Sequence, residues 1–183
     1  YNVVKAAHDI AIPASKPGVY YKDVHLLSCL EIAKGLTDIG LMKGDPEEAV
    51  EEGAHALFFP HGLGHMIGLD VHDMENLGEN FVGYDDTIRK STEFGLKSLR
   101  LARPLQTGNA ITIEPGIYMI PQLIEKWQAE GIHAEFLNFD VINKYRDFGG
   151  IRIENDFVIE EQGAVLLGDA LVYDAESVEA LRG

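Results

Sequence analysis

Two segments in the second half of the chain alternate apolar and polar residues, which predicts strands with one apolar face each. Within residues 110–114, Glu114 falls on the polar face. Within residues 151–159, Arg152 and Glu154 share the polar face. Two interpretations stay open. Either this is the solvated face of an antiparallel sheet, or it is a concave floor on which the two glutamates meet a metal ion.

Helical spacing of apolar residues dominates the chain ahead of these strands. An Asp-Pro pair at 45–46 followed by acidic residues is typical of a helix start. Residues 57–73, which are rich in glycine, predict strands and turns. Helices before strands, in 183 residues that suggest one domain, indicate the α+β class. Helices are expected at 1–12, 23–39, 45–53, within 90–100, at 121–130 and at 175–181.

Composition narrows the function classes. The net charge is −15, from 30 acidic and 15 basic side chains, and this argues against a nucleic-acid partner. No apolar run is long enough to cross a membrane. The single cysteine, Cys29, lies in an apolar helical segment and predicts a buried residue. Without an internal disulfide, a cytoplasmic location is the default expectation.

Three of the seven histidines fall within twelve positions: His61, His65 and His72. A spacing of four between the first two would suit a helical metal pair, but Gly62 and Gly64 each cost a helix about 1 kcal/mol relative to alanine. A loop or strand that bends close to a ligand is the better interpretation. Histidines that hydrogen-bond the backbone of a tight turn are the alternative.

Residues 69–72 alternate and predict a short strand with Asp70 and His72 on one face. Neutral imidazole binds metals, and a protonated imidazole donates to a developing oxyanion. Carboxylates combined with imidazole suit manganese, cobalt, iron or zinc, whereas one cysteine excludes a structural thiolate zinc site.

Three blocks of sequence, at 61–73, 112–118 and 149–154, resemble the signatures of the Xaa-Pro peptidases, prolidase and aminopeptidase P. The resemblance covers the chain from its first helix to its last. It implies the pita-bread fold, with a curved antiparallel sheet and helices outside it. It also implies a pair of divalent metal ions, usually manganese, and for some members a homodimer.

The same resemblance assigns roles to individual residues. His65 and Glu114 would bind one metal ion, and Glu154 would bridge both. His72 would be the catalytic histidine that steadies the tetrahedral intermediate, and Glu114 would also carry the proton. These roles imply hydrolysis of an Xaa-Pro peptide bond by a water molecule that the metals activate.

Substrate-binding roles follow in the same way. His61 would line the substrate pocket, and Arg152 would lie beside the metal site. Arg100 resembles the arginine with which dipeptidases grip the free carboxylate of the substrate, a contact that suits the guanidinium fork. The alternative for Arg100 is an exposed cation at a helix end near Arg103.

An Xaa-Pro dipeptidase is therefore the expected function, with an aminopeptidase P activity as the near alternative. A non-catalytic binding module and a metal-independent creatinase-like hydrolase belong to other classes. Both are disfavoured, because the residues that the resemblance assigns as ligands are present.

The chain departs from the family pattern in one respect. The family site takes two further aspartates from strands ahead of the histidine block. The aspartates before His61 all lie in expected helices or at their starts: Asp9, Asp23, Asp38 and Asp45. We therefore expect residues 1–183 to be the C-terminal portion of a single catalytic domain, without the N-terminal domain and the first aspartate-bearing strands. Alone, this portion is expected to bind metal weakly and to be inactive.

Overall fold

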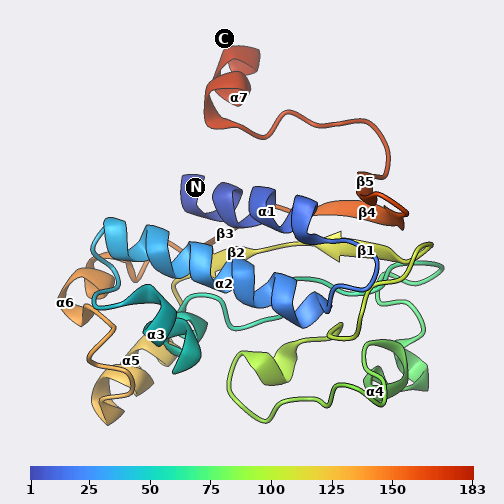
Figure 1. Cartoon of the computed structure of the whole chain (residues 1–183). Coiled ribbons are helices and arrows are strands. Elements are labelled where there is room, and N and C mark those ends of the chain that lie inside the picture. Colours follow the sequence, from blue (N-terminus) through green and yellow to red (C-terminus); the bar gives the residue numbers. More distant parts are fainter.

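The computed structural model describes all residues from Tyr1 to Gly183. Two long helices, α1 (Asn2–Ala14) and α2 (Tyr21–Asp38), lie side by side across one face of the strands (Figure 1). The two helices pack closely where Gly35 of α2 meets Val3 of α1. A Cβ atom on Gly35 would lie only 2.6 Å from the Val3 side chain. Both helices were expected, although α2 begins two residues before Asp23, which lies in its first turn.

The other expected helices are mostly confirmed. Helix α3 (Pro46–Glu51) begins as predicted, since the Asp45 carboxylate accepts hydrogen bonds from the next helical amides. Helices α5 (Pro121–Glu130) and α7 (Ala175–Arg182) also form, and α7 stands apart from the other elements in Figure 1. The short segments not foreseen are η1 (Ala54–Leu57), η2 (Glu75–Leu77), α4 (Glu79–Val82), α6 (Phe139–Ile142) and η4 (Asn143–Tyr145).

The prediction of a helix within 90–100 is wrong. Only the 3-10 turn η3 (Leu96–Ser98) forms there. Gly95 precedes it with φ of 85°, a left-handed conformation that interrupts a right-handed helix.

The strands form two small antiparallel sheets. In one, β1 (Ala110–Ile113), β4 (Asn155–Glu160) and β5 (Gly163–Leu166) lie in the order β1-β4-β5. In the other, β2 (Gly116–Tyr118) pairs with β3 (Gly150–Arg152). The single strand expected over 151–159 is therefore broken in two.

The break occurs at the same level in both paired strands. Ile113 lies opposite Asn155, and Gly116 lies opposite Arg152. The intervening residues, 114–115 on one strand and 153–154 on the other, form a kink. Pro115 has no amide hydrogen to continue the ladder, and only the amide of Ile153 crosses it, to the Pro115 carbonyl at 3.3 Å. Both glutamates of the expected site therefore lie at this kink.

The histidine block runs along the free edge of β1. Backbone amide–carbonyl hydrogen bonds join Leu63 to Glu114, His65 to Thr112 and Ile67 to Ala110, at 2.7 to 3.0 Å. This confirms that 61–65 is not helical. The strand expected over 69–72 is wrong, because these residues form an exposed loop in which Leu69 is fully exposed. Hydrogen bonds within the loop, such as that from Gly68 to Asp70, replace strand pairing.

The core lies between the two long helices and the strands. Phe58, Phe59 and Leu63 are fully buried, as are Ile111 and Ile113 of β1. The opposite face of β1 is also closed to solvent, since Thr112 is 1% and Glu114 is 7% exposed. The interpretation of this strand as having a solvated polar face is therefore wrong. No helix in the structure is long and apolar enough to cross a bilayer.

Candidate active site

His65, Glu114 and Glu154 converge at the kink between the two sheets. Each offers one ligand atom, and these atoms all lie within 4.8 Å of one another. His65 and Glu114 are buried, whereas Glu154 is exposed. These three residues are the predicted metal ligands, and the structure brings them together.

Thr112 fixes the relative positions of His65 and Glu114. Its hydroxyl accepts a hydrogen bond from the His65 amide at 3.0 Å and donates one to Glu114 Oε1 at 3.1 Å. Its carbonyl accepts a hydrogen bond from the buried Tyr21 hydroxyl at 2.6 Å. The strand that carries one ligand thus also orients the other.

The surroundings of His65 select which ring nitrogen faces the site. Nδ1 lies 2.9 Å from the Met66 carbonyl, which can only accept, so Nδ1 carries a hydrogen. Nε2 is thereby directed at Glu114 Oε1, 3.1 Å away. Burial lowers the pKa of His65, but hydrogen bonds to Glu114 and Met66 and two nearby carboxylate charges raise it overall. This orientation is typical of a histidine that binds a metal through Nε2.

The two glutamates differ in their protonation. Burial favours the neutral form of Glu114, but the His65 hydrogen bond and the Arg152 charge outweigh it and lower its pKa. The pKa of Glu154 is raised, first by burial and then by the charge of Glu114. A cation between the two carboxylates would remove this repulsion. The donor set of one imidazole and two carboxylates therefore fits a divalent ion.

Arg152 connects the metal-ligand group to a second cluster. Its Nη1 lies 2.9 Å from Glu114 Oε2, its Nε donates to the Tyr118 hydroxyl at 2.7 Å, and its Nη2 lies 3.2 Å from His61 Nε2. His61 Nδ1 donates to the Gly62 carbonyl at 2.8 Å, which leaves Nε2 as an acceptor. Burial lowers the pKa of His61, so its ring is held neutral.

A pocket of about 220 Å³ lies over these groups, and no hydrophobic residue lines it. Every residue predicted to act in the site except Glu154 lines this pocket: His61, His65, His72, Arg100, Glu114 and Arg152. The ring of His72 lies edge-on to that of His65, with centroids 4.2 Å apart. His72 thus reaches the site from the exposed loop rather than from the expected strand.

Arg100 faces this pocket but is already paired. Its Nη1 forms an ion pair with Glu75 and lies 3.6 Å from Glu79. Glu75 also lies 3.5 Å from Nδ1 of His72. The interpretation of Arg100 as a helix-end cation is wrong, because no helix forms there. Its role as a carboxylate clamp stays a prediction.

Three residues at the site had no predicted role: Tyr118, Glu75 and Thr112. For Tyr118 a signal existed in the glycines on the two strands beside it. A Cβ atom on Gly116 would lie 2.6 Å from the Tyr118 hydroxyl, and one on Gly150 would lie 2.4 Å from its ring. These glycines make room for the aromatic ring. For Glu75 the spacing of three from His72 was the only local indication.

A buried histidine and two carboxylates beside a polar pocket form a group that could hold a metal ion of the kind that hydrolases use. The model of metallopeptidase family M24 matches residues 1–161. The chain belongs to this family, which implies divalent metal ions, and its fold is the pita-bread fold of the solved structures that it matches.

Individual relatives agree with this assignment. The human Xaa-Pro dipeptidase is 40% identical over 167 residues, which is 91% of this chain and 32% of that protein. A probable Xaa-Pro aminopeptidase of Sordaria macrospora is 40% identical over 99% of the chain. Escherichia coli aminopeptidase P, solved with the inhibitor Pro-Leu, is 32% identical with a TM-score of 0.69 over 99% of the chain. The chain spans about a third of the length of these relatives.

Proposed function

We propose that this chain provides much of the active site of a peptidase that hydrolyses Xaa-Pro bonds in dipeptides with divalent metal ions. The observation that carries the proposal is the convergence of His65, Glu114 and Glu154 within 4.8 Å beside a polar pocket. Relatives named as Xaa-Pro dipeptidases and Xaa-Pro aminopeptidases support the substrate class.

The residues divide the chemical work as follows. Bound divalent ions would supply Lewis acidity and a nucleophile at neutral pH. Glu114, whose pKa is lowered, accepts a proton at Oε1, the oxygen that faces His65. His72 donates a hydrogen bond to the developing oxyanion. Arg152 holds Glu114 and the neutral His61 ring in place, so that His61 forms one wall of the substrate pocket.

Arg100 is the residue on which the preference for dipeptides depends. Its guanidinium lines the pocket, and its present partner Glu75 is a carboxylate, the same group that a dipeptide offers at its C-terminus. A substrate carboxylate would replace Glu75 at Arg100. Removing the arginine charge in Arg100→Gln should raise KM for an Xaa-Pro dipeptide more than for its C-terminal amide. An equal rise in KM for both substrates would show that Arg100 does not bind the substrate carboxylate.

The metal complement is also part of the proposal. We propose two ions, manganese foremost, with cobalt, iron or zinc as alternatives. Three ligands hold one ion weakly, so the 183 residues alone are expected to be inactive and to complete the site with aspartates outside them. Elemental analysis tests this. Two equivalents of tightly held manganese on these residues, with turnover of an Xaa-Pro dipeptide, would contradict it.

An aminopeptidase P activity is the second candidate, supported by the Sordaria and Escherichia coli relatives. Rates for a dipeptide and for a longer Xaa-Pro peptide, measured on the protein with a complete site, separate the two. Glu154→Ala separates both from a non-catalytic binding module, because peptidase activity that survived it would exclude the metal mechanism. A homodimer and a cytoplasmic location stay expectations.

A further inference from the structure

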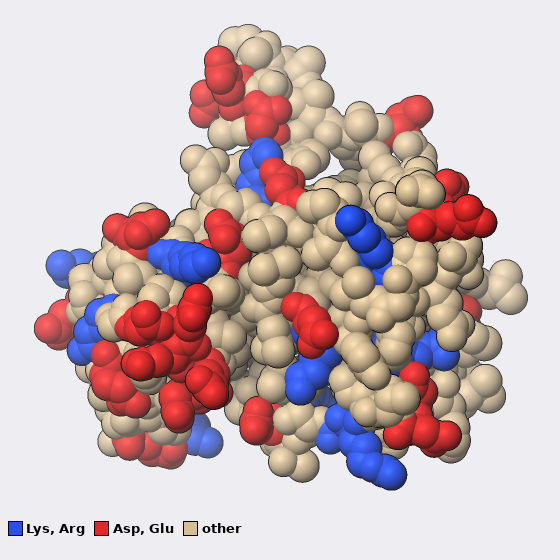
Figure 2. Space-filling model, in the orientation of Figure 1, with Lys and Arg blue, Asp and Glu red and all other residues tan.

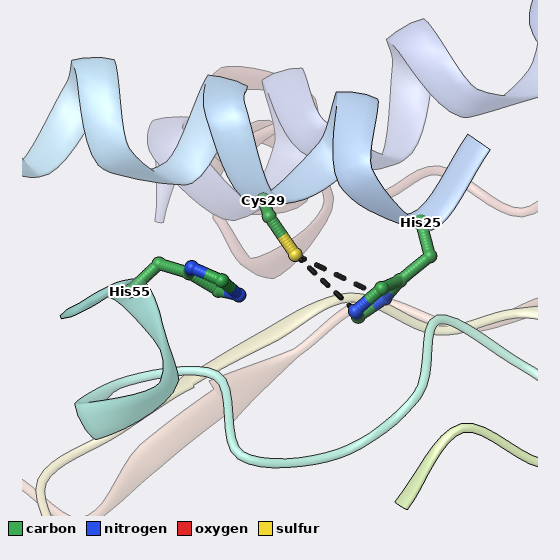
Figure 3. A group of neighbouring side chains, drawn as sticks. All are labelled: His25, Cys29 and His55. Carbon is green, nitrogen blue, oxygen red and sulfur yellow. Dashed lines mark hydrogen bonds between the residues drawn. The ribbon is translucent and has the colours of Figure 1, made fainter. Parts of the chain in front are cut away.

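A second cluster of potential ligands lies inside the core, away from the pocket. His25 and Cys29 project from adjacent turns of α2, and His55 projects from η1 toward them (Figure 3). Their ligand atoms all lie within 4.8 Å of one another, and all three residues are buried. Cys29 Sγ lies 3.4 Å from His25 Nε2.

His55 has no partner that explains its position. It is 2% exposed, yet neither ring nitrogen makes a hydrogen bond. Leaving a buried donor or acceptor unsatisfied costs about 1–3 kcal/mol, and such groups are rare in native proteins. Figure 3 shows the His55 ring directed at Cys29 from the side opposite His25. The unpartnered His55 ring and the Cys29 thiol are thus placed so that both could contact one bound ion.

The protonation of the histidines suits ligation. Burial lowers the pKa of His25 to about 3 and that of His55 to about 4, so both rings are neutral at pH 7. Each then keeps one nitrogen lone pair free. Burial raises the pKa of the Cys29 thiol, so the thiolate would form only when a cation replaces its proton.

This cluster is separate from the M24 metal centre. The ring of Phe59 lies between the two groups of histidines, with its centroid 5.3 Å from that of His25 and 4.8 Å from that of His61. No residue of the cluster lines the peptidase pocket. An ion in the cluster would therefore not touch the substrate.

His55 also borders an acidic pocket. The pocket has a volume of about 440 Å³, and it is lined as well by Glu51, Glu52, Glu93 and His133. Its three carboxylates outnumber its one lysine, Lys126, so the pocket is net negative and attracts cations. Figure 2 shows acidic side chains gathered over α3, which carries Glu51 of this pocket. His55 thus connects an open acidic pocket with the buried thiol.

We propose that His25, Cys29 and His55 form a buried binding site for copper(I). Thiolate and imidazole are ligands that copper(I) accepts. With bond lengths like those of zinc, about 2.3 Å to sulfur and 2.0 Å to nitrogen, a trigonal site places a sulfur and a nitrogen ligand about 3.7 Å apart. Cys29 Sγ lies 3.4 Å from His25 Nε2 and 3.9 Å from His25 Nδ1, within a group whose ligand atoms all lie within 4.8 Å of one another, so a rotation of the His25 ring would direct Nε2 at the ion.

Charge decides between copper(I) and zinc. One thiolate and one monovalent ion give a neutral centre, which a buried site without a carboxylate tolerates. A divalent ion would leave a net positive charge there, at a cost in free energy, and zinc would also need a fourth ligand. On binding, the Cys29 sulfur–hydrogen bond breaks, a sulfur–copper bond forms, and the proton leaves to solvent without any change in oxidation state.

Anaerobic titration with copper(I) against the chelator bicinchoninate tests the proposal. The full chain is used with His65→Gln and Glu154→Gln, so that copper at the peptidase site does not contribute. One equivalent should be retained, and X-ray absorption should show one sulfur and two nitrogen neighbours. Cys29→Ser and His55→Gln should each weaken binding by more than about 100-fold, while circular dichroism verifies that both variants fold.

A matched control is His133→Gln, which alters the open pocket and leaves the three ligands in place. It should retain the full equivalent of copper(I). Three results would overturn the proposal: no retention against the chelator, equal retention by Cys29→Ser, or preference for zinc over copper(I). None of these depends on peptidase activity, so the outcome is independent of the proposed function.

Discussion

The backbone of Gly64 passes so close to Thr112 that a Cβ atom on Gly64 would lie 2.0 Å from the Thr112 carbonyl oxygen. This approach lets the histidine block pair with β1 and brings His65 level with Glu114. The contact is with backbone rather than with a movable side chain, so the site depends on the absence of a side chain at this position.

Gly64→Ala should therefore separate the histidine block from β1. We expect a loss of about 3 kcal/mol in the free energy of unfolding, together with weaker metal binding through His65. Urea denaturation measures the first effect. Gly18→Ala is the control, because its Cβ would meet nothing within 4 Å and only its φ of 84° is unfavourable. It should cost about 1 kcal/mol. Equal losses would contradict the steric argument.

Thr112→Val should weaken metal binding without removing a ligand. Valine keeps the shape of threonine but leaves the buried His65 amide without its acceptor and Glu114 without its donor. Losing hydrogen bonds that orient metal ligands lowers metal affinity about 10- to 100-fold, and calorimetric titration of the protein with a complete site against manganese would measure this loss. Thr87→Val, whose hydroxyl bonds Asp85 at the exposed surface, should leave the affinity unchanged. An unchanged metal affinity in Thr112→Val would show that His65 and Glu114 do not need the Thr112 hydroxyl to hold their positions.

Arg152→Lys should lower peptide hydrolysis on the order of 10- to 100-fold. A lysine keeps the charge beside Glu114, but it cannot simultaneously reach Tyr118 and His61 as the guanidinium fork does. Steady-state kinetics on the protein with a complete site measures the effect. Arg146→Lys, at an ion pair with the exposed Glu125, serves as the control and should retain full activity. Wild-type rates in Arg152→Lys would show that charge alone is sufficient.

Acidification should destabilise the fold through His8. Burial lowers the pKa of His8 below 6.5, against an opposing hydrogen bond and charge from Asp9, and Lys5 lowers it further. Between the folded pKa and the unfolded value of about 6.5, the unfolded chain binds more protons. The contribution of His8 to the free energy of unfolding is therefore fully present above that pH window and is lost as the pH falls through it.

His8→Gln tests this contribution, because glutamine does not titrate. The free energy of unfolding, measured by urea denaturation at several pH values below 7, should fall less steeply in the variant than in the wild type. Comparing slopes removes any fixed cost of the substitution at this buried position beside Phe157 and Tyr173. Parallel slopes would show that His8 does not cause the loss of stability at low pH.

The sequence predicted those parts of the fold and site that depend on local pattern. Alternation predicted the strands beside Glu114 and Glu154, although both glutamates lie in the break between strands rather than within them. The glycines around His65 correctly excluded a helix. The His25–His55 cluster could not be predicted, because it depends on how α2 packs against η1. The exposed loop at 69–72 was misread because its alternation has no partner strand.

The break between β3 and β4 was missed for a similar reason. It is a property of two paired strands, since Pro115 on one strand faces the interruption on the other. Nothing in the sequence of 151–159 alone marks it. Arg100 was placed in the pocket correctly, but its pairing with Glu75 depends on a loop with no regular pattern.

The kink at residues 114–115 and 153–154 has a mechanical consequence. The two sheets are continuous in chain but are joined across the kink by a single backbone hydrogen bond. An ion held by Glu114 and Glu154 would link the two strands where their backbone hydrogen bonds are interrupted. The two sheets would then move as one rigid unit. Occupancy of the site would then govern the rigidity of the sheet that builds it, and slower amide exchange at Ile153 in the metal-loaded protein would report this stiffening.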